Sequence, residues 1–434
     1  MSINAVSRVP ESPRMTLTAP PEGAPQHPPR LARPDALPLL VAPPFALPGP
    51  DGLSGFWADV RRRGTPLVSA DPLGSADHRA VTFLWRGTPA TRAVQVLPNK
   101  LGDPRAPEGN LMRHAAGTDV WHWTVRLRTD WRGTYDVFVD EGDGPAPGEP
   151  GYWPWLRGQV RADPFNSRSL PRRWSGQPVG YAELPDAPDA VDWEPRPDVP
   201  RGTVTEHVVT SELLGDSRRV WLYEPAAEHA RRAVDGLPVL VLLDGEHWQP
   251  RLGLAHLLDN LVADGRIPPV AAVLPESVDA GTRWTQLTCR PEFVAFLERE
   301  LLPWAASRLP LTEDPARTVV AGQSLGGLTA AYAAAHSPYR FGNALVQSGS
   351  FWWPDGPEPE WLTGELAAAK RLPVRFWLSF GEQEWVALPA ARRLRDTLAA
   401  AGYDDAVYRE FNGGHDYLCW RTELTEGLVG LLGD

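Results

Sequence analysis

The stretch that decides the fold is RTVVAGQSLGGLTAAYAAAHS, residues 317–337. It opens with a short apolar run rich in β-branched residues, which is typical of a buried strand, and it closes with a helical pattern over Leu328–Ala335. Between them, Gly322-Gln323-Ser324-Leu325-Gly326 has the Gly-x-Ser-x-Gly spacing. On a strand-to-helix turn this spacing holds a serine in a strained elbow, with its hydroxyl projecting from the sheet edge. Ser324 is therefore a candidate nucleophile.

The alternation of strand and helix patterns continues on both sides of this elbow. The apolar runs LPVLVLLDG (237–245) and PPVAAVLP (268–275) alternate with the amphipathic segments AHLLDNLVADG (255–265) and FVAFLERELLPWAASRLP (293–310). Strands that are buried on both faces and joined by helical crossovers form a parallel sheet covered by helices. We therefore expect an α/β domain over residues 201–434.

The first half of the chain has a different pattern. Within residues 51–184, runs rich in β-branched and aromatic residues are separated by Gly, Pro and Asp, which predicts an all-β sandwich. In one of them, Trp121–Leu127, apolar and polar residues alternate, which predicts one apolar and one solvated face. The other runs are Ala80–Trp85, Ala93–Leu97 and Thr134–Val139.

Two proline-rich segments flank this domain. Residues 1–50 show no apolar period and are predicted to form a disordered tail. Residues 185–200 are rich in Pro and Asp and are predicted to form a semi-rigid linker to the α/β domain.

Composition narrows the function classes. The formal net charge of −11 argues against the clustered basic face that a nucleic-acid-binding protein needs. Two cysteines, Cys289 and Cys419, are too few for a disulfide framework or a four-cysteine zinc site. No apolar stretch approaches the roughly 20 residues that span a bilayer, and no signal-peptide pattern opens the sequence. We expect a cytoplasmic protein without nucleic-acid or membrane partners and without a metal or cofactor of its own.

A serine nucleophile needs a base, which in this chain order follows it. His336 and His415 are the histidines after Ser324. His336 lies on the helix that leaves the elbow and points away from the strand ends. His415 follows the apolar run 406–411 in a Gly-Gly loop, which is flexible and is the position expected of a catalytic histidine. We therefore assign His415 as the base.

Besides the nucleophile and the base, such a catalytic triad has a third member, an acid, which accepts a hydrogen bond from the histidine ring and so fixes its tautomer. The strand predicted over Val374–Phe380 is followed by Gly381-Glu382-Gln383-Glu384, where such folds place the acid. Glu384 is our assignment and Glu382 is the alternative. Two further carboxylates, Asp404 and Asp416, stay open.

The oxyanion of the reaction needs two backbone donors. The amide of Leu325, at the start of the helix after Ser324, is one candidate. The second is expected from the loop after the strand Val239–Leu243, where the amide of Glu246 or of Gly245 is a candidate.

Both halves of the chain carry distinctive motifs: VTFLWRG (81–87), TDVWHWTVRL with WRGTYDVFV (118–139), ADPFNSRSL (162–170), LLDGEHW (242–248), RWTQL (283–287), GQSLGG (322–327), GEQEW (381–385) and GGHDYLCWR (413–421). Together these motifs resemble one family, the enterochelin (ferric enterobactin) esterases. The resemblance implies a β-sandwich followed by an α/β-hydrolase domain. It also implies the triad Ser324, Glu384 and His415.

The resemblance further suggests substrate contacts. Arg283, in the motif Arg-x-x-Glu-Leu, is a candidate contact for catecholate oxygens, although this chain has Gln286 at the fourth position. The alternative is a surface arginine paired with Asp279. Four tryptophans follow predicted strands at the ligand-binding edge and are candidates for stacking on aromatic rings. They are Trp248, Trp352, Trp353 and Trp385.

The implied function is a serine esterase that cleaves the ester bonds of a catecholate siderophore, an enterobactin-like trilactone, and so releases iron in the cytoplasm. Iron enters only as part of the substrate. Two other functions stay open: a general carboxyl or aryl esterase of feruloyl or acetyl ester type, and a non-catalytic siderophore-binding protein. Because the substrate is large, we expect the β-sandwich to add a second wall to the pocket.

Overall fold

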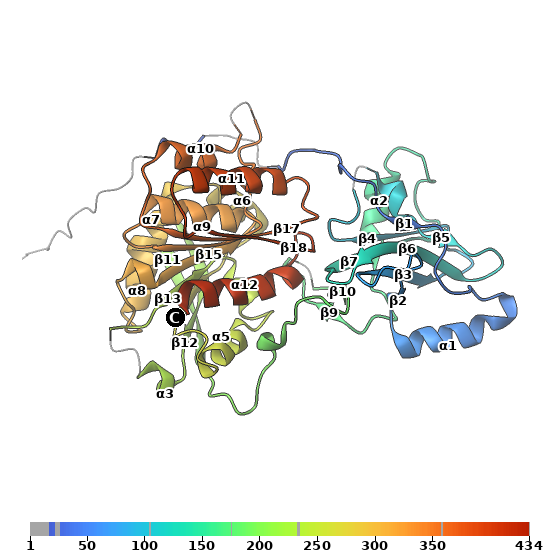
Figure 1. Cartoon of the computed structure of the whole chain (residues 1–434), viewed down its shortest axis with the longest axis horizontal. Coiled ribbons are helices and arrows are strands. Elements are labelled where there is room, and N and C mark those ends of the chain that lie inside the picture. Colours follow the sequence, from blue (N-terminus) through green and yellow to red (C-terminus); the bar gives the residue numbers. More distant parts are fainter. Residues whose placement is uncertain are drawn as a thin grey trace, which may run out of the picture.

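The computed structural model describes residues 17–21, 27–103, 106–174, 176–231, 235–356 and 359–433. Two domains lie side by side, a smaller one built of strands and a larger one in which helices cover a sheet (Figure 1). In the described residues, no helix combines the length and apolar character needed to cross a membrane.

The N-terminal domain is the expected β-sandwich. One antiparallel sheet has the order β1-β6-β3-β2 with β5 beside β6, and the other has the order β4-β7-β10-β9 with β8 beside β7. Their facing sides bury one apolar core that includes Phe83, Trp123 and Val137. The strands are β1 Leu39–Leu40, β2 Leu67–Ala70, β3 His78–Arg86, β4 Ala93–Pro98, β5 Arg113–His114, β6 Val120–Arg128, β7 Arg132–Asp140, β8 Val160–Arg161, β9 Ser169–Leu170 and β10 Val179–Glu183.

The outer face of the first sheet is buried, contrary to the expectation of a solvated face on β6. Helix α1 (Leu53–Arg63) packs Trp57 and Val60 against Leu84 and Val120 on that side. His122 and Thr124 of β6 are likewise only 5% and 2% exposed. The alternation of polar and apolar residues in a strand does not show whether another element covers the polar face. Here helix α1, which lies outside the sheet, packs on that side. A second helix, α2 (Tyr152–Gly158), packs against Phe138 of the other sheet.

The predicted disorder of residues 1–50 is wrong for residues 27–50. Leu39–Leu40 pairs with β6, and the Arg33 guanidinium donates to the carbonyl oxygen of Lys100 at 2.7 Å. Upstream, the Leu31 carbonyl accepts a hydrogen bond from the Trp385 indole at 3.1 Å. Prolines prevent regular structure here, yet tertiary contacts fix the segment along both domains. Residues 1–16 and 22–26 of the predicted tail lie outside the described residues.

The C-terminal domain has one sheet with the order β11-β12-β14-β13-β15-β16-β17-β18. Strands β13 to β18 run parallel, whereas β12 pairs antiparallel with both of its neighbours, β11 and β14. This is the α/β-hydrolase arrangement expected from the sequence. The strands are β11 Thr203–Ser211, β12 Asp216–Glu224, β13 Val239–Leu242, β14 Ala271–Pro275, β15 Thr318–Gln323, β16 Asn343–Gln347, β17 Arg375–Gly381 and β18 Val407–Phe411.

Helices cover both faces of this sheet (Figure 1). One face packs against the helices that carry Phe293, Leu328 and Leu394, and the other packs against those that carry Leu258 and Leu428. A single π-helical turn, Leu297–Leu301, joins α7 to α8. The helices are α3 Ala227–Ala230, α4 Gly245–Trp248, α5 Leu254–Ala263, α6 Ala280–Gln286, α7 Pro291–Phe296, α8 Leu302–Ala306, α9 Leu325–His336, α10 Trp361–Ala368, α11 Leu388–Ala400 and α12 Tyr417–Leu432.

The predicted linker 185–200 does connect the domains, and it is packed onto the second one. The Trp193 ring is 3% exposed, and its indole N–H donates to the Arg421 carbonyl oxygen at 3.1 Å. The Asn260 side chain of α5 donates to the Asp192 and Glu194 carbonyl oxygens, each at 2.9 Å. The linker is therefore held by both α5 and α12.

Candidate active site

Ser324 lies on the turn between β15 and α9, with φ 59° and ψ −122°. A non-glycine residue in this region is strained by about 1–3 kcal/mol, and it persists only where its surroundings hold it. A Cβ atom on Gly322 would lie 2.5 Å from the backbone of Gly326, so the turn requires a glycine there. The Ser324 N–H donates to the Gln347 carbonyl oxygen at 3.0 Å, which ties the elbow to β16.

The candidate base and acid are in direct contact. The His415 Nδ1 atom lies 2.6 Å from Glu384 Oε2. Glu384 is 2% exposed, and its other oxygen accepts hydrogen bonds from the Ser348 hydroxyl at 2.5 Å and the Gly381 N–H at 2.8 Å. Both groups follow strands of the same sheet at its carboxyl edge, where Ser324 also lies.

The environment of Glu384 fixes its ionisation. Burial alone would raise the pKa of this carboxyl, but the His415 ring and the hydrogen bonds from His415, Ser348 and Gly381 outweigh it and lower the pKa. An ionised Glu384 accepts from Nδ1–H of His415, which leaves Nε2 unprotonated. That is the tautomer a general base for Ser324 needs.

The alternatives from the sequence are placed differently. The Glu382 side chain is 33% exposed and forms an ion pair with Arg128 at 2.8 Å. Asp416 is committed to backbone and side-chain donors of Thr134, as described below, and Asp404 is exposed. His336 ends helix α9. The geometry thus favours Glu384 as the acid.

Two supporting residues were missed from the sequence. The Trp420 indole donates to the Ser348 hydroxyl at 2.9 Å, and the Trp420 ring stands edge-on to the His415 ring with centroids 4.8 Å apart. Ser348 directly follows β16, so its strand-end position was an available signal, whereas for Trp420, within α12, the signal was its place in the GGHDYLCWR motif.

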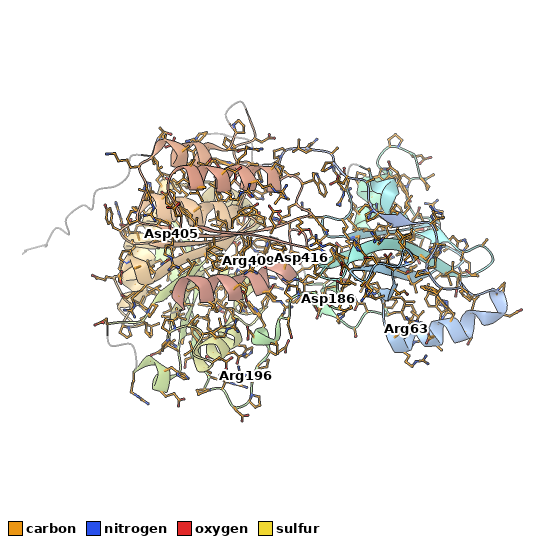
Figure 2. All side chains as sticks on the ribbon, viewed as in Figure 1. Arg63, Asp186, Arg196, Asp405, Arg409 and Asp416 are labelled. Carbon is orange, nitrogen blue, oxygen red and sulfur yellow. The ribbon has the colours of Figure 1, made fainter. Side chains whose placement is uncertain are left out.

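The histidine loop is tied to the β-sandwich. The Asn99 side chain donates to the His415 carbonyl oxygen at 2.8 Å, and Asp416 accepts from the Thr134 N–H at 2.6 Å and hydroxyl at 2.7 Å. Figure 2 places Asp416 at the junction of the domains. A Cβ atom on Gly414 would lie 2.7 Å from the Asn99 carbonyl oxygen. The Gly-Gly pair thus permits close packing, and the expectation of a flexible loop is corrected.

The two candidate oxyanion loops lie against each other. A Cβ atom on Gly326 would lie 3.6 Å from Asp244 Oδ2 and 3.7 Å from Leu243 Cβ. Leu325 and Glu246 are residues of the first turns of α9 and α4, where the N–H groups have no partner within the helix. The assignment of their amides as oxyanion donors stays a prediction.

Four charged side chains are buried beside these loops. Asp244 accepts from Arg173, Arg283 and the Ser277 hydroxyl, and Glu246 accepts from Arg173. Burial would raise the pKa of Asp244, but the charges of Arg173 and Arg283 hold it well below its usual range. Burial and the neighbouring Asp244 charge raise the pKa of Glu246.

Arg283 is not a surface residue and is not paired with Asp279. Its Nε and Nη2 atoms donate to Asp244 at 2.9 and 2.8 Å, and Nη2 also donates to the Gln323 carbonyl oxygen at 3.1 Å. Asp279 instead caps α6 through the Thr282 N–H at 2.9 Å. Arg283 thus holds the residue that precedes the nucleophile, and its expected contact with catecholate stays a prediction.

The candidate tryptophans divide into two groups. Trp248, Trp352 and Trp353 are 0%, 6% and 2% exposed within the hydrophobic core, so the expectation that they stack on a ligand is corrected. The Trp248 indole donates to the Gln323 side-chain oxygen at 3.1 Å. Trp385 is half-buried and lines a cavity between the domains.

Two adjoining cavities lie at the domain junction. One, of about 330 Å³, is lined by His415 and by Arg173 and Trp174 of the sandwich. The other, of about 410 Å³, is lined by Lys100 and Trp385. Both include Asn99, Thr134, Arg172 and Val179, so they form one cleft, which we call the interdomain cleft. Among the described residues, no group of three or more His, Cys, Asp or Glu side chains is placed to hold a metal ion.

Comparisons with known proteins agree with this architecture. The family model "Putative esterase" matches residues 211–431, and "Enterochelin esterase, N-terminal" matches residues 80–193. An iron(III) enterobactin esterase of Dickeya dadantii is 34% identical over 88% of this chain and 93% of that protein. The structure of a ferric enterobactin esterase from Salmonella typhimurium has a TM-score of 0.76 and 34% identity over 87% of this chain and 98% of that one. An enterobactin esterase from Shigella flexneri, crystallised with enterobactin, has a TM-score of 0.74 and 32% identity over 88% and 98%.

Proposed function

The chain belongs to the enterochelin (iron(III) enterobactin) esterase family, and on this premise we propose that it is a serine esterase that hydrolyses the ester bonds of a catecholate siderophore. The observation that carries the proposal is the contact of His415 with the buried Glu384, which lies at the sheet edge of Ser324 and places His415 at the wall of the interdomain cleft.

The proposed reaction follows from the roles of the residues. His415 Nε2 takes the proton of the Ser324 hydroxyl while its oxygen attacks the ester carbonyl carbon. Amides of Leu325 and Glu246 stabilise the negative oxygen of the tetrahedral intermediate. The intermediate collapses, His415 returns the proton to the departing alcohol, and an acyl ester on Ser324 remains. Water repeats the sequence and releases the acid.

The interdomain cleft supports a large anionic substrate. Lys100 is one of the residues that line it. The ammonium group also lies 5.8 Å from the Trp385 ring centroid. A cation attracts catecholate oxygens, and an aromatic ring offers a face to the catechol.

We further propose that the activity is cytoplasmic and that the chain needs no cofactor, with iron entering only as part of the substrate. Both cysteines are free and buried, which suits a reducing compartment. The triad chemistry itself uses only protein groups.

The test is to incubate the protein with ferric enterobactin, iron-free enterobactin, a second catecholate trilactone, and p-nitrophenyl and feruloyl esters, and to resolve the products by mass. We expect linear fragments from the trilactones, and unchanged p-nitrophenyl ester hydrolysis after EDTA treatment. Turnover of the simple esters alone would identify a general esterase. Siderophore binding without cleavage would identify a binding protein.

A further inference from the structure

One arginine of the β-sandwich reaches into the hydrolase domain. Arg173 lies between β9 and β10, and its side chain is 9% exposed. Its Nε and Nη2 atoms donate to Glu246 Oε1 at 2.7 and 2.5 Å, and Nη2 also contacts Asp244 Oδ1. Both carboxylates belong to the turn after β13 that opens α4.

That turn is fixed from two sides. From within its own domain, Asp244 is held by Arg283 and by the Gln323 side chain, which precedes the nucleophile. The Ser277 N–H donates to Glu246 Oε2 at 3.2 Å. From the other domain, Arg173 is the group that binds both acids at once. A planar guanidinium with several fixed donors is suited to such a double contact.

The charges of this cluster balance. Two carboxylates, Asp244 and Glu246, face two guanidinium groups, Arg173 and Arg283, and all four side chains are at most 10% exposed. Without Arg173, one buried carboxylate loses its ion-pair partner. The surplus negative charge would lie beside the amides that face the developing oxyanion, where it opposes the reaction most strongly.

We propose that Arg173 is a positioning residue for ester hydrolysis, supplied by the N-terminal domain to the oxyanion loop of the C-terminal domain. The inference rests on the proposed function, since it takes Ser324 as the nucleophile and the turn at Asp244 as the oxyanion loop. It makes the sandwich part of the catalytic unit for small esters as well as large ones.

The test compares full-length Arg173→Met with Arg128→Met, a matched control. Arg128 also bridges the domains, through Glu382, but at the surface and away from the oxyanion loop. Both variants are assayed on p-nitrophenyl acetate below their melting temperatures, with folding checked by circular dichroism. We expect kcat of Arg173→Met to fall about 10- to 100-fold with KM within threefold, because losing one oxyanion donor outright costs about 10²–10³. Arg128→Met should stay within twofold.

A second variant separates charge from packing. In Arg173→Met/Glu246→Gln the unpaired charge is gone while the Glu246 backbone amide remains, so kcat should recover at least threefold over Arg173→Met. If Arg173→Met does not fold, the test uses Arg173→Lys instead. This variant keeps the positive charge but cannot bind both carboxylates at once. A kcat loss of threefold or more would then support the proposal.

Three results would overturn the inference: an unchanged kcat in the folded arginine variant, an equal loss in Arg128→Met, or a change confined to KM, which would make Arg173 a substrate contact. Wild-type protein that cleaves no ester at all would instead refute the proposed function. Wild-type protein that cleaves p-nitrophenyl esters but no siderophore refutes the substrate and leaves the Arg173 test intact.

Discussion

Replacing Glu384 by glutamine tests the assignment of the acid, because the structure dictates how the new amide must sit. The Ser348 hydroxyl accepts a hydrogen bond from the Trp420 indole and donates its own hydrogen to Glu384. The Gly381 N–H donates to the same oxygen. A glutamine must therefore place its carbonyl oxygen toward Ser348 and Gly381, and its NH₂ group toward His415.

The consequence is a wrong tautomer. Facing an NH₂ donor, Nδ1 of His415 must accept, so the ring proton moves to Nε2 and the base toward Ser324 is lost. A tautomer error of this kind lowers kcat about 10⁴-fold in a serine protease triad, equivalent to about 5.5 kcal/mol of transition-state stabilisation. We expect a loss of this order for Glu384→Gln, with little change in KM.

Glu382→Gln is the matched control, since it makes the same chemical change two residues away. The Glu382 carboxylate is 33% exposed and pairs with Arg128, whose side chain is 44% exposed. Such surface pairs contribute about 0–1 kcal/mol, so activity should stay within about twofold. The assay is steady-state hydrolysis of p-nitrophenyl acetate and of the siderophore, with melting temperatures measured in parallel. Equal, mild losses in both variants would refute the triad and point to a Ser324–His415 dyad.

Three further predictions address the nucleophile, the cleft and acid stability. Ser324→Ala should lower kcat on the order of 10⁴-fold or more while siderophore binding, followed by tryptophan fluorescence, persists; a variant with a tenth of wild-type turnover contradicts the assignment. Lys100→Met should raise KM for the ferric siderophore about three- to tenfold, while KM for p-nitrophenyl acetate stays unchanged; equal effects on both substrates contradict a role for the cleft. Because the pKa of Asp244 is lowered in the folded state, its stabilising contribution is present above the unfolded pKa of about 3.9 and is lost as pH falls toward the folded value. Urea unfolding should therefore give a free energy of unfolding that declines below about pH 4, and Asp244→Asn should flatten that decline.

Features encoded by neighbouring residues were predictable from the sequence. The elbow at Ser324 is a local pattern of small residues between a strand and a helix, and the structure has it at that position. The contact between Glu384 and His415 could be predicted because each residue follows a recognisable strand, and parallel strands end at the same edge of the sheet.

Features that depend on distant residues were not predictable. Arg283 is separated from Asp244 by 39 residues, and Arg173 by 71, so no local pattern links them. Trp248 follows a strand as a ligand-binding residue would, yet it turns into the core toward Gln323. Residues 27–50 lack any periodicity because partners on two domains, and not their own backbone bonds, fix them.

The contacts of Asn99 and Thr134 with the histidine loop have a consequence for recombining domains between relatives. Each contact joins a backbone group to a side chain of the opposite domain, so the fit depends on both parents of a chimera. The domain boundary suggests a crossover within residues 185–200. In such a chimera Thr134 and Asp416 would come from different parents, and so would Asn99 and the histidine loop that it contacts. A chimera that also transfers residues 412–422 keeps donor and acceptor from the same parent. The unit to be exchanged between relatives therefore consists of two separate stretches of the sequence, the sandwich and residues 412–422.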